Sequence, residues 1–168
     1  MKGRIISRRP WLLMPVETKV RELESKVLLG CVAAENGFGV LLGRNGFNLS
    51  GIYPKGIYFD KCISAFKEQT LDRQVNELGN ILVSLDEEGL IYTSEDHWLS
   101  TRVSKKTLSL SSLIFTWGQE QYRMLSKVPG AVENLVNSGS PRVDIWRLAS
   151  SVLYRDQVRK LNNQFGNF

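Results

Sequence analysis

Short apolar runs alternate with longer amphipathic stretches along this chain, and this alternation constrains its fold more than any other feature. The short runs, which we expect to be strands, cover residues 11–16, 38–42, 56–59, 81–85, 113–117 and 135–136. The first expected helix begins at Thr18 and stops at Asn36-Gly37. Further helices are expected over residues 66–78, 119–127 and 143–163. Strands separated by helices predict an α/β fold, a three-layer sandwich with a mostly parallel sheet of about six strands covered on both faces.

The composition supports one packed domain but does not select a ligand. The chain has 168 residues, and 42% of them are hydrophobic, which is enough apolar matter for a core. The net charge of +5 permits nucleic acid, anionic lipid or a phosphorylated sugar as partner, yet the basic residues are scattered among acidic ones. The aromatic residues form no strip with basic residues, so we expect no nucleic-acid partner.

The two cysteines and the N-terminus indicate a cytoplasmic protein without a structural metal. Cys31 lies in an apolar stretch and is expected to be a buried thiol, whereas Cys62 is expected in a loop. Neither has a CxxC partner or a neighbouring histidine, so we expect no zinc site. The opening MKGRIISRRP lacks the apolar run of a signal peptide, and no window approaches the ~18 apolar residues of a membrane span.

Ligands of open parallel sheets bind beyond the carboxyl ends of the strands, so the polar residues that follow each strand are candidates. After the first expected strand come Glu17, Lys19, Arg21 and Glu22. One interpretation places these side chains on a rim that faces the ligand. The other makes Thr18 the N-cap of a helix whose first turn is solvated. The sequence leaves both open.

The third expected strand is followed by a second polar group, Asp60 and Lys61, with Ser64 and Lys67 nearby. An aspartate in this position is often only the cap of the next turn. The same loop, with its lysines and serine, also suits a carboxylate or phosphate group.

The fourth expected strand ends in three consecutive acids, Asp86, Glu87 and Glu88, before Gly89. Three adjacent carboxylates repel one another, so we expect at least one of them to face solvent. A carboxylate held in a cleft beside another has a raised pKa and can serve as a general acid or base. This segment is the best catalytic candidate, and an acidic surface loop is the alternative.

Other catalytic patterns are absent from the sequence. The single histidine, His97, follows the candidate N-cap Ser94 and is expected on a helix surface. No serine lies in a GxSxG elbow, and no Cys–His pair is evident. The glycines at 37, 39 and 43 lie before and within an expected strand, which excludes a dinucleotide-binding loop.

Five collinear segments carry a family resemblance: RPWLLMPVETKVRELESKVLLGCVAAENGFGVLLG, PKGIYFDKCISAFKE, LDEEGLIY, FTWGQEQ and SGSPRVD. Together they resemble the N-terminal half of the bacterial surface carbohydrate (surface polysaccharide) biosynthesis protein family. The resemblance implies a Rossmann-like domain equivalent to the N-terminal domain of a GT-B glycosyltransferase. It also implies a division into an acceptor-side domain, residues 1–140, and a hinge with a helix, residues 141–168, that leads to a C-terminal domain expected beyond this sequence.

The implied function is transfer of a sugar from a nucleotide donor to a lipopolysaccharide or capsule glycan. The glycan or lipid-linked acceptor belongs to this half and the nucleotide sugar to the C-terminal domain, so we expect this chain alone to be inactive. No cofactor or metal is implied, and the expected location is the cytoplasm, with peripheral association at the inner membrane as an option. The alternatives are a non-catalytic sugar- or nucleotide-binding module and an assembly subunit.

The resemblance also assigns roles to the strand-end residues. It implies Glu87 or Glu88 as the general acid or base, with Asp86 beside them. The implied substrate-binding residues are Glu17, Lys19, Arg21, Glu22, Asp60, Lys61, Ser64 and Arg142. Arg142 belongs to a G-x-P-R connection in which Pro141 fixes its own φ and favours an extended Ser140.

Overall fold

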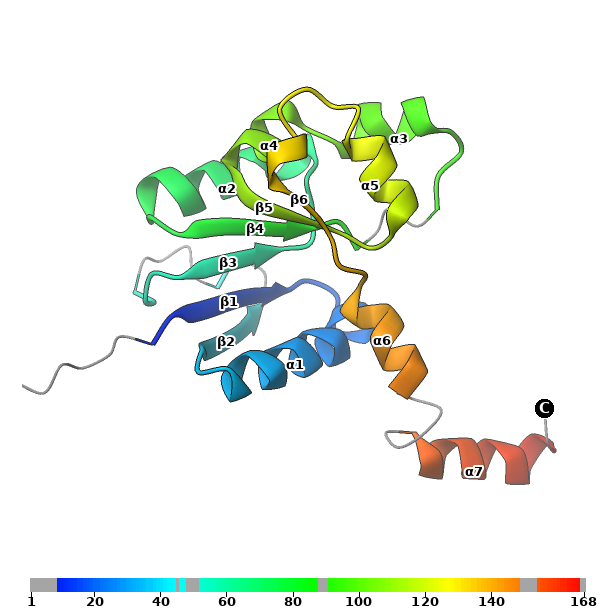
Figure 1. Cartoon of the computed structure of the whole chain (residues 1–168). Helices are drawn as coiled ribbons and strands as arrows, with labels where there is room; N and C mark the ends of the chain where they lie inside the picture. The colour runs from blue at the N-terminus through cyan, green and yellow to red at the C-terminus, as the bar shows by residue number, and fades with distance from the viewer. Residues whose placement is uncertain (1–8, 45, 48–51, 88–90, 149–153, 167–168) are drawn as a thin grey trace, which may run out of the picture.

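The computed structural model describes residues 9–44, 46–47, 52–87, 91–148 and 154–166 (Figure 1). Six strands form one sheet in which every neighbouring pair is parallel. They are β1 (Trp11–Val16), β2 (Gly39–Arg44), β3 (Ile57–Asp60), β4 (Ile81–Leu85), β5 (Ser111–Thr116) and β6 (Leu135–Asn137). The expected α/β, Rossmann-like sandwich with a parallel sheet of about six strands is therefore confirmed.

The order of the strands in the sheet is β2-β1-β3-β4-β5-β6. From β1 the chain first moves to one side, to β2, and then crosses back to β3 and continues outward to β6. Such an order, one of the two common doubly wound arrangements, leaves a crevice between the carboxyl ends of β1 and β3. The fold therefore assigns a ligand crevice to the loops that begin at Glu17 and Lys61.

The helices divide between the two faces of the sheet. They are α1 (Lys19–Glu35), η1 (Ala65–Lys67), α2 (Glu68–Asp72), the π-turn η2 (Arg73–Glu77), α3 (Glu95–Arg102), α4 (Lys105–Leu110), α5 (Gln119–Leu125), η3 (Val132–Asn134), α6 (Pro141–Leu148) and α7 (Arg155–Phe165). Because side chains alternate along a strand, Met14 packs toward α1 while the adjacent Leu13 packs toward α2. The elements α3, α4 and α5 join α2 on that second face.

Helix α1 packs against the rest of the protein with a mostly polar stripe of side chains rather than with its most apolar stripe. Its buried residues are Glu22, Ser25, Lys26 and Gly30. Val20 is 96% exposed, and Cys31 is exposed, so the expectation of a buried Cys31 is wrong. The helix is rotated because ion pairs draw two charged side chains inward, and because Gly30 lets Val40 and Met14 pack against its backbone.

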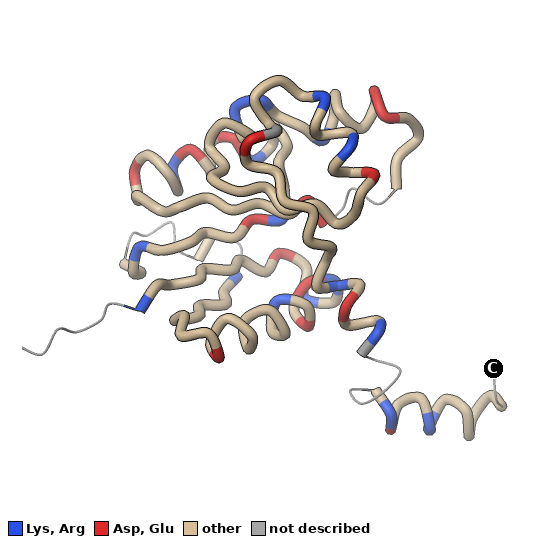
Figure 2. Tube along the Cα trace, viewed as in Figure 1, with Lys and Arg blue, Asp and Glu red and all other residues tan. Residues whose placement is uncertain are grey.

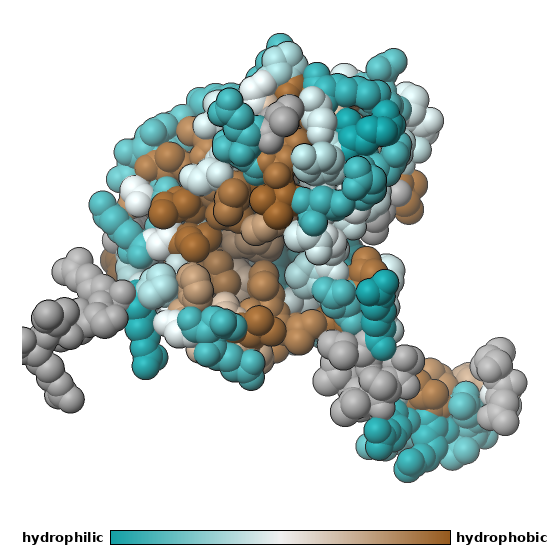
Figure 3. All heavy atoms as spheres, viewed as in Figure 1, coloured by the Kyte–Doolittle hydropathy of each residue, from teal (hydrophilic) through white to brown (hydrophobic). Residues whose placement is uncertain are grey.

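Helices lie on both faces of the sheet, as expected, but the face that carries α1 is only partly covered. The side chains of Ile81, Leu113 and Val136, from β4, β5 and β6, are 54%, 40% and 39% exposed on it. Figure 3 shows the apolar atoms spread over the middle of the molecule. Beside them, α6 and the sheet enclose a pocket of about 200 Å³ lined by Leu29, Phe59, Leu85, Phe115, Ser138, Gly139, Pro141 and Asp144.

The expected C-terminal helix, residues 143–163, is two helices. Pro141 occupies the first position of α6, where its missing N–H costs nothing, and the preceding Gly139 has a φ of 85°. Helix α6 packs against α1 through the buried Ile145. Tyr154 precedes α7 with non-helical backbone angles, and its hydroxyl donates a hydrogen bond to the Glu24 carboxylate. The division into domains at residue 140 stays a prediction.

Among the helices of the described residues, none combines the length and the apolar character needed to cross a bilayer.

Candidate functional site

A pocket of about 180 Å³ opens at the carboxyl ends of β1 and β3, where the strand order reverses. Its lining residues are Glu17, Lys61, Cys62, Ser64, Phe66, Lys67 and Arg102. We call it the switch-point pocket. Three of the lining side chains are cationic, and the only carboxylate among them is that of Glu17. The polar groups that follow the first and third strands in the sequence therefore meet in one place, as the strand-end rule predicts.

Beneath the pocket, the buried carboxylate of Glu22 holds two lysines. It lies 2.9 Å from Nζ of Lys61 and 3.0 Å from Nζ of Lys26, and it accepts hydrogen bonds of 3.0 Å from the backbone N–H groups of Glu17 and Thr18. Burial raises the pKa of this carboxyl group, but the hydrogen bonds outweigh burial and hold the pKa at about 2. Glu22 is thus a fixed anion.

The interpretation of a solvated first helical turn holds for Lys19 and Arg21, whose side chains are exposed, but not for Glu22, which is buried. Thr18 is at the N-cap position, yet its side chain accepts no capping hydrogen bond. Glu22 satisfies the backbone donors instead, from inside the protein. The side chain of Lys26 completes the network by donating to the Pro15 carbonyl at the end of β1. The ion pairs therefore join the strand end, the helix start and the β3 loop into one unit.

The two lysines of the β3 loop connect this network to the pocket. Nζ of Lys61 lies 3.1 Å from Glu17, whose side chain is 47% exposed. Nζ of Lys67 lies 3.5 Å from a carboxylate oxygen of Asp60 and 4.0 Å from Glu17. The Glu17 carboxylate is therefore the most accessible anion beside these ammonium groups.

Asp60 is fully buried and has the capping role that the sequence suggested. Its Oδ1 accepts a hydrogen bond of 3.0 Å from the backbone N–H of Cys62, while Oδ2 accepts no hydrogen bond from the described residues. Burial raises the pKa of this carboxyl group, against the effect of Lys67 and Lys26. Asp60 orients the loop and does not line the pocket.

Cys62 and Ser64 form the polar floor of the loop. The Sγ of Cys62 lies 2.9 Å from Oγ of Ser64, and both side chains are buried. Burial raises the pKa of the Cys62 thiol, with further contributions from Asp86 and Asp60. A protonated thiol is a poor nucleophile, so Cys62 contributes packing and a hydrogen bond rather than covalent chemistry.

The structure describes two of the three acids after β4, and both are buried, so the expectation that at least one of the three faces solvent stays a prediction. Asp86 is buried and pairs with Arg102, 2.7 Å from its Nη2. Glu87 is buried, its Oε2 accepts no hydrogen bond from the described residues, and burial raises the pKa of its carboxyl group. Its backbone N–H donates to the Lys61 carbonyl at 3.3 Å. Glu88 lies outside the described residues.

The remaining expected binding residues lie apart from the pocket. Lys19 lines a separate pocket with Arg44, on the other side of Glu17. Arg21 donates a hydrogen bond of 3.0 Å to Oγ1 of Thr18. Arg21 and Arg142 line a third pocket between α1 and α6, and Arg142 also donates to the Glu87 carbonyl at 3.3 Å. The structure therefore brings together Glu17, Lys61 and Ser64 in the pocket, with Glu22 and Asp60 beneath them.

Two residues of the candidate site, Lys26 and Arg102, escape sequence reasoning. Lys26 had a usable signal, since it follows Glu22 by four residues on the same helix. No sequence signal indicated Arg102, because it lies in the last turn of α3 and its partner, Asp86, comes 16 residues earlier. Figure 2 shows acidic and basic residues interspersed over the whole trace, so a cluster of charge in the sequence does not single out this site.

His97 is exposed on α3, and its backbone N–H donates to Oγ of the N-cap Ser94 at 3.2 Å, as expected. Within the described ranges, no group of three or more His, Cys, Asp or Glu side chains is placed to hold a metal ion.

Comparison with known proteins adds no family assignment: no protein-family model, curated protein or solved structure matches this chain significantly.

Proposed function

We propose that this chain binds an anionic sugar in the switch-point pocket and serves as the acceptor-side domain of a sugar transferase. The observation that carries the proposal is the convergence of Lys61, Lys67 and Arg102 on one pocket in the crevice of a doubly wound sheet. The resemblance to surface carbohydrate biosynthesis proteins supports an acidic glycan as the ligand.

The electrostatics favour an anion over a neutral sugar. The pocket has three cationic side chains and one carboxylate, and that carboxylate is half exposed and free to move toward water. The fixed anions Glu22 and Asp86 hold two of the cations in position from beneath. A carboxylate or phosphate of the ligand would accept charge-assisted hydrogen bonds from side chains that are already oriented.

A second candidate function is sugar binding without chemistry. It is favoured by the placement of Asp86 and Glu87, which are buried and do not line the pocket. A general base must reach the hydroxyl from which it removes a proton. In the transferase proposal, Glu87 becomes accessible when the rest of the enzyme and the acceptor are bound. Turnover by a Glu87→Gln variant of a reconstituted two-domain enzyme separates the two functions, because only the transferase proposal predicts its loss.

The binding proposal is tested by calorimetric titration with glucuronic acid. We expect Lys67→Met to weaken binding at least about tenfold, since a charge-assisted hydrogen bond is lost. Lys127→Met is the matched control, because Lys127 pairs with Glu95 on the surface and does not line the pocket. Equal affinities for the two variants would overturn the proposal.

A further inference from the structure

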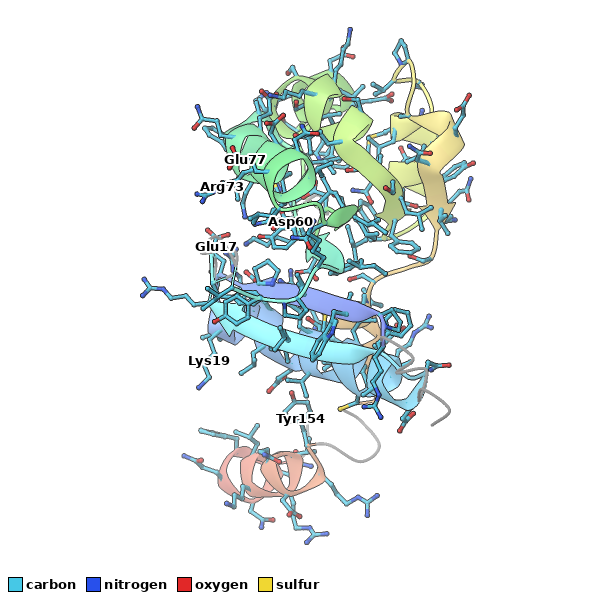
Figure 4. All side chains as sticks on the ribbon, turned by 90° about the vertical axis from the view of Figure 1, so that its left-hand side faces the viewer. Glu17, Lys19, Asp60, Arg73, Glu77 and Tyr154 are labelled. Atoms are coloured by element: carbon cyan, nitrogen blue, oxygen red, sulfur yellow. The ribbon has the colours of Figure 1, made fainter. Side chains whose placement is uncertain are left out.

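A second pocket lies across Glu17 from the first, at the carboxyl ends of β1 and β2. It has a volume of about 400 Å³, more than twice that of the switch-point pocket. Its lining residues are Val16, Glu17, Lys19, Leu23, Leu42, Gly43 and Arg44. We call it the β2-side pocket. Glu17 lines both pockets. In Figure 4 it lies between Asp60 and Lys19.

Among the described residues, no carboxylate pairs with the cations of the β2-side pocket. Lys19 and Arg44 are exposed, and neither forms an ion pair with a carboxylate among the described residues. The Lys61 and Lys67 ammonium groups, in contrast, already contact Glu17. An anionic group that enters the β2-side pocket therefore gains two cations without displacing a carboxylate from either of them.

The rest of this pocket is apolar. Leu42 is 38% exposed, and Leu23 and Val16 are half-buried beside it. A pocket with an apolar wall and a few charged groups suits a sugar ring, which offers an apolar C–H face and charged or polar substituents around it. Gly43, which also lines the pocket, has no room for a side chain, because a Cβ at residue 43 would lie 2.4 Å from the Phe47 ring.

We propose that the two pockets are subsites for one extended ligand, an acidic oligosaccharide of at least two sugar units with an anionic group on each. This inference rests on the proposed function, because it takes the switch-point pocket as the first subsite. One anionic group pairs with Lys61 and Lys67, and the second pairs with Lys19 and Arg44. The link between the sugars crosses Glu17.

Glu17 then contributes specificity. Its carboxylate repels an anion placed at the junction of the subsites and tolerates anions on either side of it. A ligand with two separated charges is favoured over one with adjacent charges. The covalent link between the sugars makes the second binding event intramolecular, so a two-unit ligand gains affinity beyond that of either unit alone.

The test compares galacturonic acid, its dimer and its trimer in calorimetric titrations of the wild-type chain. We expect the dimer to bind at least about tenfold more tightly than the monomer. In the double variant Lys19→Ala, Arg44→Ala this gain disappears, so the dimer binds no more tightly than the monomer. Both side chains are exposed, and retention of the fold is checked by the thermal unfolding midpoint.

The outcomes separate the two proposals. If the monomer and the dimer bind equally, or if the dimer keeps its full advantage over the monomer in the double variant, the two-subsite inference is wrong. If Lys67→Met leaves binding of every probe unchanged, or if no acidic sugar binds, the proposed function itself fails.

Discussion

Nζ of Lys61 lies 2.9 Å from a carboxylate oxygen of Glu22, and both side chains are buried. The two residues are 39 positions apart, so their contact fixes the β3 loop against the start of α1. A buried ion pair of this kind requires extensive hydrogen bonding to offset its desolvation. Lys26 and the backbone of Glu17 and Thr18 provide it. The pocket above the pair is therefore preorganised before a ligand arrives.

The stability of the fold should depend on pH through Glu22. Its pKa is lowered from 4.5 to about 2 in the folded chain, so its contribution is present above pH 4.5 and is lost as the pH falls toward 2. The shift corresponds to on the order of 3 kcal/mol. Urea denaturation at pH 7 should show Glu22→Gln less stable by about that amount, and the loss of stability of the wild type below pH 4.5 should be reduced in the variant.

The control for this experiment is Glu120→Gln, since Glu120 is an exposed carboxylate that pairs with Arg123 on the surface of α5. We expect it to unfold at nearly the same urea concentration as the wild type. Equal stability of Glu22→Gln and Glu120→Gln would contradict the assignment of Glu22 as the fixed anion of the site.

Glu87 should have the opposite pH dependence. Burial raises the pKa of its carboxyl group, although Lys26, Arg142 and Lys61 favour the charged form. Its contribution to stability is therefore complete below pH 4.5 and is lost as the pH rises through the raised pKa. Glu87→Gln cannot ionise, so its stability should exceed that of the wild type above that pKa and match it at acidic pH. The prediction would be contradicted if the wild type did not become less stable than Glu87→Gln as the pH rises through the raised pKa.

The half-exposed Glu17 competes with the ligand for Lys61 and Lys67. Glu17→Gln removes that competitor and keeps the shape of the side chain. We expect this variant to bind glucuronic acid several-fold more tightly than the wild type, with a smaller effect at high salt because exposed charges are screened. Calorimetric titrations at two salt concentrations measure both changes. Weaker binding by the variant would indicate that Glu17 contacts the sugar directly.

The two thiols should differ in reactivity. Cys31 is exposed on α1, whereas Cys62 is buried with a raised pKa. A colorimetric thiol reagent should label one thiol per folded chain, and two after denaturation. Cys31→Ser should abolish the fast reaction, and labelling of Cys62 at a similar rate would show that the pocket loop opens readily.

The fold class and the place of the site were predictable from local patterns. The β-like runs 11–16 and 81–85 match β1 and β4 residue for residue, because continuous apolar runs of that length suit strands buried on both faces. The rule that ligands bind beyond strand ends grouped Glu17, Lys61 and Ser64, and these residues line one pocket; their role in binding stays a prediction. Both inferences depend on residues close to each other in the sequence.

The orientation of α1 was not predictable in the same way. Its apolar residues Val20 and Val27 suggested the buried stripe, yet they are exposed while Glu22 and Lys26 are buried. The partner that reverses the preference is Lys61, which lies far away in the sequence. Tertiary ion pairs override the apolar periodicity of a single helix. Arg102 likewise lies at the pocket because of an ion pair, with Asp86, that the local sequence does not reveal.

The central claim, that the switch-point pocket binds an anionic sugar, is tested most directly by titrating the wild-type chain with glucuronic acid and with glucose. The two sugars differ in a carboxylate, so the comparison isolates the contribution of the cations that line the pocket. We predict saturable binding of glucuronic acid that weakens as salt is raised, and at least about tenfold weaker binding of glucose. Equal binding of the two sugars, or binding of neither, would contradict the claim.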